Sequence, residues 1–157
     1  MSDEIPYLQQ LHTDLATLLG EAIWAFALVE RETYRYMKKL SSDTLDILMA
    51  DQSIPVRIRV IKHLIERAEG TETMKQCAFK CIKRVHTLAE TRNHIAHNPF
   101  STWVDLDAEV FVSEIEKVTD NRQILSLEQL EEFARNAHTL ASEMADALSD
   151  LSYRDSR

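Results

Sequence analysis

Glycine and proline are scarce in this chain, and their scarcity limits the folds that it can adopt. The 157 residues include 2 Gly and 3 Pro, whereas an average soluble protein of this length carries about 11 and about 8. Small all-β domains need Gly at tight turns and bulges. A Rossmann fingerprint or a P-loop needs several Gly within one short loop. These classes are excluded, and the composition indicates an all-α protein with a few long helices.

Length and composition are those of one globular domain spanning residues 1–157, with 45% hydrophobic and 28% charged residues. The longest apolar run, Ala22 to Val29, is too short to span a bilayer, so no membrane association is expected. The N-terminus is acidic and has no apolar segment of the kind found in secretory signals. Together with only 2 Cys, this favours a cytoplasmic location.

Helical periodicity predicts the first elements. Between about Pro6 and Leu40, at about 100° per residue, one stripe collects Leu8, Leu11, Leu15, Leu19, Ala22, Phe26, Val29, Thr33, Met37 and Leu40. Gly20 is a position where this helix could bend or divide. A short turn is expected through Met49. A second helix should run from the N-cap Ser53 to Gly70, and a third from the cap Thr71 to about His97.

The region between residues 100 and 123 has a different pattern, because its apolar residues alternate loosely as in a short β-hairpin or an irregular arm. The last helix begins after Ser126, which forms a capping box with Gln129 while Leu125 can pack onto Leu130. The predicted fold is a four- to five-helix bundle with one excursion at residues 100–123.

Polar residues inside apolar stripes are the candidates for function. Arg92 falls in the middle of the apolar face of the third helix, and Asn93 and His97 share one edge of that face. His94 points roughly the other way, toward solvent, and is kept as a supporting residue. A buried Arg needs a partner or a ligand. Glu30 falls inside the stripe of the first helix, between Phe26 and Met37, and is the only carboxylate there. It is the predicted partner of Arg92, within or between subunits.

The string LAETRNHIAHNPF at residues 88–100 resembles the signature of the HEPN superfamily (higher eukaryotes and prokaryotes nucleotide-binding domains). In that signature an Arg and a polar residue, often Asn, are followed by three residues and a His late in a helix. Arg92, Asn93 and His97 match it position by position. A long first helix and a final helix after an irregular arm also fit this all-α family.

The resemblance implies an endoribonuclease that needs no metal or other cofactor and works as a homodimer, with both motifs facing each other across the interface. His97 would act as general acid and base, and Arg92 would stabilise the negative charge of the phosphorane. Asn93 would orient the His or donate to a phosphate oxygen. The substrate would be single-stranded RNA, and its 2′-hydroxyl would be the nucleophile.

Two other interpretations stay open at this point. Many HEPN-like domains act only as dimerisation or partner-binding modules, in which case the motif is structural, and an unrelated helical protein would need no motif at all. A neighbouring gene for a small nucleotidyltransferase would indicate a toxin–antitoxin pair. Cys77 and Cys81 are predicted core residues, because two thiols fall short of the four ligands of a structural zinc site.

Charge is uneven along the chain, although the net value is −8. Residues 51–100 hold 9 basic and 5 acidic side chains and are the only basic third of the sequence. The motif lies within this third. A basic groove on an acidic protein can still attract a phosphate backbone, so the overall acidity does not exclude an RNA substrate.

Overall fold

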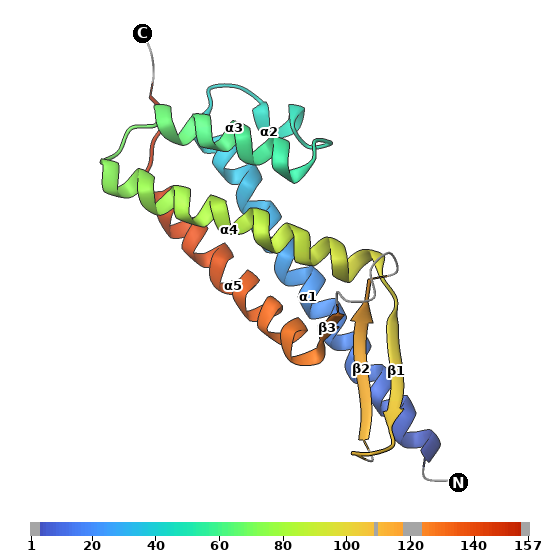
Figure 1. Cartoon of the computed structure of the whole chain (residues 1–157). Helices are drawn as coiled ribbons and strands as arrows, with labels where there is room; N and C mark the ends of the chain where they lie inside the picture. Colours follow the sequence, from blue (N-terminus) through green and yellow to red (C-terminus); the bar gives the residue numbers. More distant parts are fainter. Residues whose placement is uncertain (1–3, 109, 118–123, 155–157) are drawn as a thin grey trace.

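The computed structural model describes residues 4–108, 110–117 and 124–154 of the chain, and these form five helices and one small antiparallel sheet (Figure 1). The helices are α1 (Glu4–Leu40), α2 (Leu45–Leu48), α3 (Ile54–Arg67), α4 (Glu72–His97) and α5 (Leu127–Ser149). The strands are β1 (Phe100–Asp105), β2 (Val110–Glu116) and β3 (Ile124–Ser126). The predicted all-α bundle with a β-hairpin excursion is therefore confirmed.

Helix α1 extends along the whole molecule, with α5 packed along it, and α4 lies against both (Figure 1). The shorter α3 packs on the C-terminal part of α1 and on α4, with its start beside the second half of α4 (Figure 1). The predicted stripe of α1 is buried at Leu15 and at each predicted position from Ala22 to Leu40. The side chain of Leu8 lies outside the part of the chain that is described. The stripe packs onto a core that includes Phe133, whose ring stacks on that of Phe26.

The helix boundaries follow the capping residues. Ser126 and Gln129 form the predicted capping box at the start of α5, with hydrogen bonds of 3.2 and 2.9 Å. The Thr71 hydroxyl accepts from the backbone N–H of Met74 at the start of α4. Helix α3 ends at Arg67 rather than at Gly70, because Ala68 is already extended and Glu69 pairs with Ser152 in an isolated bridge.

Two sequence expectations about α1 and α4 change in the structure. Gly20 neither bends nor divides α1, which is continuous from Glu4 to Leu40. Cys81 is buried as expected, but Cys77 is exposed, since at about 100° per residue it lies at the edge of the buried face of α4, next to the fully buried Ala78. None of the described helices is long and apolar enough to cross a membrane.

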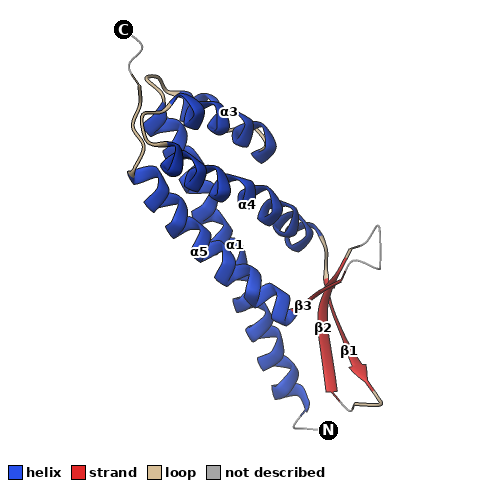
Figure 2. Cartoon of the chain, turned by 60° about the vertical axis from the view of Figure 1, so that its left-hand side comes forward, coloured by secondary structure: helices blue, strands red, loops and turns tan. Residues whose placement is uncertain are grey.

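The three strands pair in the order β1-β2-β3, and both pairs are antiparallel. The hairpin of β1 and β2 leaves the bundle at the end of α4 and projects toward the N-terminal end of α1 (Figure 2). Its base packs into the core through Ile115, which is fully buried, whereas Leu106 at its tip is 84% exposed. Residues 118–123 of the predicted excursion lie outside the described residues.

Candidate functional site

Arg92 lies on the inner side of α4, where the sequence places it. One guanidinium nitrogen, Nη2, is 3.6 Å from Oε2 of Glu30 on α1, so the predicted ion pair is present within one chain. Nη1 donates to the side-chain oxygen of Asn93 at 3.1 Å, and the guanidinium lies over the Phe26 ring at 5.6 Å from its centroid. The side chain keeps 30% of its surface exposed. It is therefore anchored on one side and open to solvent on the other.

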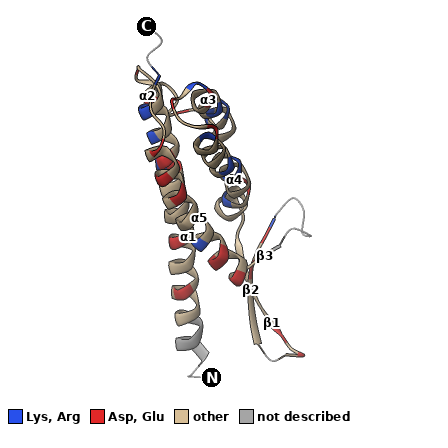
Figure 3. Ribbon diagram, turned by 90° about the vertical axis from the view of Figure 1, so that its left-hand side faces the viewer, with Lys and Arg blue, Asp and Glu red and all other residues tan. Residues whose placement is uncertain are grey.

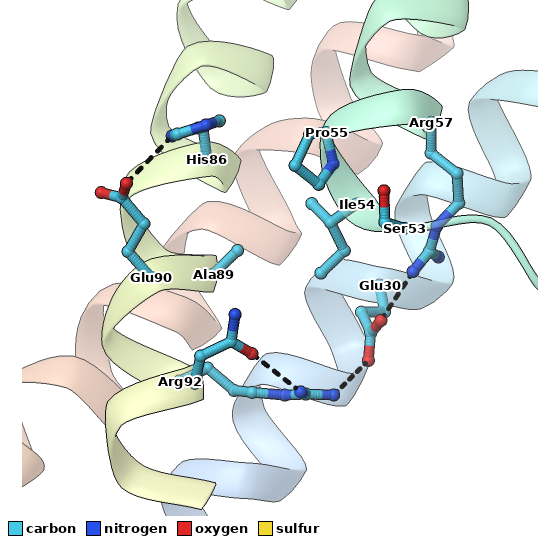
Figure 4. A pocket seen from close by; sticks show the side chains of 10 residues that line it. Glu30, Ser53, Ile54, Pro55, Arg57, His86, Ala89, Glu90 and Arg92 are labelled. Carbon is cyan, nitrogen blue, oxygen red and sulfur yellow. Dashed lines mark hydrogen bonds and ion pairs between the residues drawn. The ribbon is translucent and has the colours of Figure 1, made fainter. Parts of the chain in front are cut away.

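A second arginine, Arg57 on α3, is the closer partner of Glu30 (Figure 4). Its Nη2 donates to Oε1 of Glu30 at 2.9 Å, and its side chain is only 5% exposed. Nη1 donates to the Thr33 hydroxyl at 3.3 Å, and the guanidinium lies over the Tyr34 ring at 4.8 Å from its centroid. One carboxylate thus bridges two guanidinium groups and ties α1, α3 and α4 together.

Arg57 was not identified from the sequence, although a signal for it exists. It lies three residues after Ile54 and four before Ile61, so it borders the apolar stripe of α3 in the way that Arg92 interrupts the stripe of α4. Helical periodicity in α3 therefore marks Arg57 as a charged residue at the edge of an apolar face.

The interpretation of Glu30 as the carboxylate within the stripe of α1 was incomplete, because Glu32 is buried more deeply, at 1% exposure. It forms ion pairs with Arg31 and Arg35 of its own helix at 3.2 and 3.0 Å. Several helices pack around α1 near these residues, so a larger part of its circumference is buried than the single apolar stripe.

Asn93 and His97 are both exposed on α4. Asn93 contacts Arg92, whereas His97 occupies the last residue of the helix, beside the start of the hairpin. His94 is half-buried rather than solvent-facing, and its Nε2 lies 3.2 Å from the backbone oxygen of Ile115. The prediction for His94 was wrong because the hairpin covers the side of the last turn that faces away from the bundle.

A pocket of about 350 Å³ opens beside the bridged arginines, between the start of α3, the C-terminal half of α1 and the second half of α4 (Figure 4). Both arginines and Glu30 line it, and His97 lies outside its lining. The remaining lining residues are Ser53, Ile54, Pro55, His86, Ala89, Glu90 and Asn93.

The charges around the pocket are mixed but locally unbalanced. Glu90 and His86 form a pair at the rim, 3.9 Å apart, and both side chains are at least half exposed. The inner end holds two guanidinium groups against the single carboxylate of Glu30. Lysine and arginine positions are prominent along α3 and α4, whereas acidic positions spread along α1 and α5 (Figure 3). This arrangement suits a ligand that carries negative charge.

Comparison of the chain with protein-family models, with curated proteins and with solved structures finds no match.

Proposed function

We propose that this protein is a metal-independent endoribonuclease of the HEPN type, with Arg92, Asn93 and His97 as its catalytic residues. The observation that carries the proposal is the state of Arg92. Its guanidinium is held by Glu30 and Asn93 at the edge of a pocket, yet it stays 30% exposed. A fixed, partly desolvated cation is what stabilisation of a phosphorane requires.

The reaction would be an internal transesterification of RNA. The 2′-hydroxyl oxygen attacks the adjacent phosphorus, the bond from phosphorus to the 5′-oxygen breaks, and a 2′,3′-cyclic phosphate forms. One imidazole accepts the 2′-hydroxyl proton, and a protonated group supplies a proton to the leaving 5′-oxygen. Histidine serves both steps near neutral pH, and the exposed side chain of His97 is accessible to a substrate.

The helix geometry favours a site shared between two copies. Arg92 and His97 are five residues apart, which in an α-helix separates them by about 7.5 Å along the axis and about 140° around it. Arg92 faces the bundle, whereas His97 faces outward at the helix end. One chain therefore presents the two side chains in different directions. A homodimer could bring the His97 of one copy to the Arg92 of the other.

The test is cleavage of a fluorescent single-stranded oligoribonucleotide by purified protein in EDTA. The His97→Ala variant is expected to lose activity at least about 100-fold, the scale of general acid–base catalysis. Its melting temperature should not change, because His97 is exposed. His138→Ala, which removes an exposed histidine from α5, is the matched control and should cleave normally. Cleavage that survives His97→Ala would refute the assignment.

A non-catalytic HEPN-like module for dimerisation or partner binding is the second candidate. The bridge from Arg92 through Glu30 to Arg57 connects three helices, which is what a purely structural motif would do. Exposed apolar side chains on the hairpin, including Leu106 and Phe111, would then serve a protein interface. A stable dimer by analytical ultracentrifugation, combined with no cleavage of any RNA, would favour this candidate. A nucleotidyltransferase-type antitoxin would be a partner of the ribonuclease, not of the non-catalytic module.

A further inference from the structure

The pocket next to Arg92 has features that the ribonuclease proposal does not use. One wall is the start of α3, where Ser53 is the N-cap and Ile54 and Pro55 form the first turn. The opposite wall carries Arg92, and Arg57 closes the inner end (Figure 4). His97 takes no part in this pocket. The pocket can therefore bind a ligand without taking part in RNA cleavage.

Among the described residues of the first turn, no acidic side chain or capping hydrogen bond offsets the partial positive charge at the start of α3. The Ser53 hydroxyl accepts no hydrogen bond from the first turn, and that turn contains no acidic side chain. The first backbone N–H groups of a helix have no partner within the helix, and they carry the positive end of its dipole. Asp or Glu commonly occupies such a position, but here the N–H of Val56 keeps no side-chain cap. Backbone groups of this kind bind phosphate in many proteins.

Arg57 is the second and independent observation. Its side chain is 95% buried, and its Nε has no hydrogen-bond partner among the described residues. It shares one carboxylate with Arg92, so the inner end of the pocket carries two positive charges against one negative charge. Only Arg57 is buried, whereas Arg92 is partly solvated and the second carboxylate of the pocket, Glu90, lies exposed at the rim. The positive excess is therefore confined to the inner end, where an anion would be stabilised.

We propose that this pocket binds the phosphoryl group of a phosphomonoester. Arg92 would donate from the N–H groups that Glu30 and Asn93 leave available. In the first turn of α3 the backbone N–H groups of Ile54 and Val56 would donate, because Pro55 has none. Arg57 would contribute its charge from the inner end. The volume of about 350 Å³ lies at the lower end of the range for small-molecule sites. It accommodates one small phosphorylated unit, either a free phosphate compound or the phosphorylated end of an RNA.

The decisive experiment compares Ser53→Asp with Ser53→Asn. Both residues are good helix N-caps, and Ser53 is exposed, so both variants should be as stable as the parent protein. Asp adds a negative charge at the mouth of the pocket, whereas Asn has nearly the same shape without charge. Either cap can accept from the first-turn N–H groups that phosphate would use, so binding of inorganic phosphate, followed by NMR titration at about 50 mM salt, should weaken in both variants. The added charge should make it about tenfold weaker in the Asp variant than in the Asn variant.

A third variant controls for general electrostatics. Arg59→Gln removes a positive charge from an exposed position on the same helix, and phosphate affinity should change less than twofold. Equal weakening in Arg59→Gln and Ser53→Asp would overturn the proposal, as would equal affinities of the two Ser53 variants. Failure of the parent protein to bind phosphate at millimolar concentration would overturn it as well.

The source of the phosphoryl group is distinguished with oligoribonucleotides and the His97→Ala protein, which keeps the pocket intact. Tighter binding of a 5′- or 3′-phosphorylated hexamer than of the same hexamer with hydroxyl ends identifies an RNA end. Equal binding of both hexamers, with inorganic phosphate still bound, identifies a free phosphate compound. A protein that binds phosphate but never cleaves RNA would refute the ribonuclease proposal and support the phosphate-binding pocket.

Discussion

Replacing Glu30 with Gln tests the central bridge most directly. Gln keeps the size of the side chain and one acceptor oxygen but removes the charge that neutralises Arg57. Loss of one partner from a fully buried ion pair costs about 3–5 kcal/mol, and an exposed pair is worth at most about 1 kcal/mol. Arg57 is 5% exposed and Glu30 is 24% exposed, and one hydrogen bond is retained. The free energy of unfolding should therefore fall by about 2 kcal/mol.

The two arginines should not contribute equally. Arg57 is 2.9 Å from Glu30 and buried, whereas Arg92 is 3.6 Å away and 30% exposed. In double-mutant cycles, the coupling of Glu30 to Arg57 should be about 1.5–2 kcal/mol. The coupling of Glu30 to Arg92 should be below about 0.5 kcal/mol. Urea denaturation followed by circular dichroism measures both, with Arg57→Gln and Arg92→Gln as the second substitutions.

Glu90→Gln is the control for this series, because Glu90 is exposed and lies 3.9 Å from His86. Its removal should change the free energy of unfolding by less than about 0.5 kcal/mol. For a chain of this length, the effect of Glu30→Gln corresponds to a melting temperature lower by about 4–8 °C. A larger coupling to Arg92 than to Arg57 would contradict the assignment of Arg57 as the principal partner.

Two further predictions concern stability away from the bridge. Burial raises the pKa of Tyr36 above its ordinary value of 10.0, so folding favours the neutral phenol and stability should fall as pH rises above about 10, by up to about 1.4 kcal/mol per pH unit. In urea titrations at pH 8 to 11, Tyr36→Phe should remove this loss of stability at high pH. At pH 8 it should lower the free energy of unfolding by about 1 kcal/mol, because the hydrogen bond from the Tyr36 hydroxyl to the backbone oxygen of Met144 (3.0 Å) is lost. Gly70 has φ +151°, and a Cβ there would lie 2.7 Å from Leu151 Cδ2, so Gly70→Ala should lower the free energy of unfolding by about 1–3 kcal/mol. A thermal melt that leaves the Gly70→Ala variant unchanged would contradict this reasoning.

Most helices were predictable because their boundaries are encoded locally, whereas α3 ends earlier than its sequence predicts, where Glu69 pairs with Ser152. Thr71 and Ser126 begin helices through their own hydroxyl groups, and the apolar stripe of α1 repeats with the helical period. Such signals do not depend on what the helix packs against. The burial of a polar residue does depend on it, and the errors about the carboxylates of α1 and about His94 arise there. Glu32 is buried because several helices surround α1, and His94 is half-buried because the hairpin folds over it.

The candidate site was predictable in part for the same reason. Arg92 and Glu30 each interrupt an apolar stripe, so each could be identified on its own helix, and their pairing followed from charge. The pocket could not be predicted in this way. Its walls come from three helices that are distant in sequence, and the angle at which the start of α3 meets α4 is a property of tertiary packing.

The distances around Glu30 indicate that Arg92 has a role other than neutralising this carboxylate. Were Arg92 present only to neutralise Glu30, it would be redundant, because Arg57 already makes a closer and better-buried pair with that carboxylate. A surplus guanidinium at the edge of a pocket adds little to stability, since its pair is long and its side chain is partly solvated. Its charge is, however, well placed for an anion in the pocket. Arg92→Gln should therefore leave the free energy of unfolding within about 1 kcal/mol of the parent value and still abolish phosphate binding. If Arg92→Gln lowers the free energy of unfolding by as much as it lowers the free energy of phosphate binding, Arg92 is a structural residue.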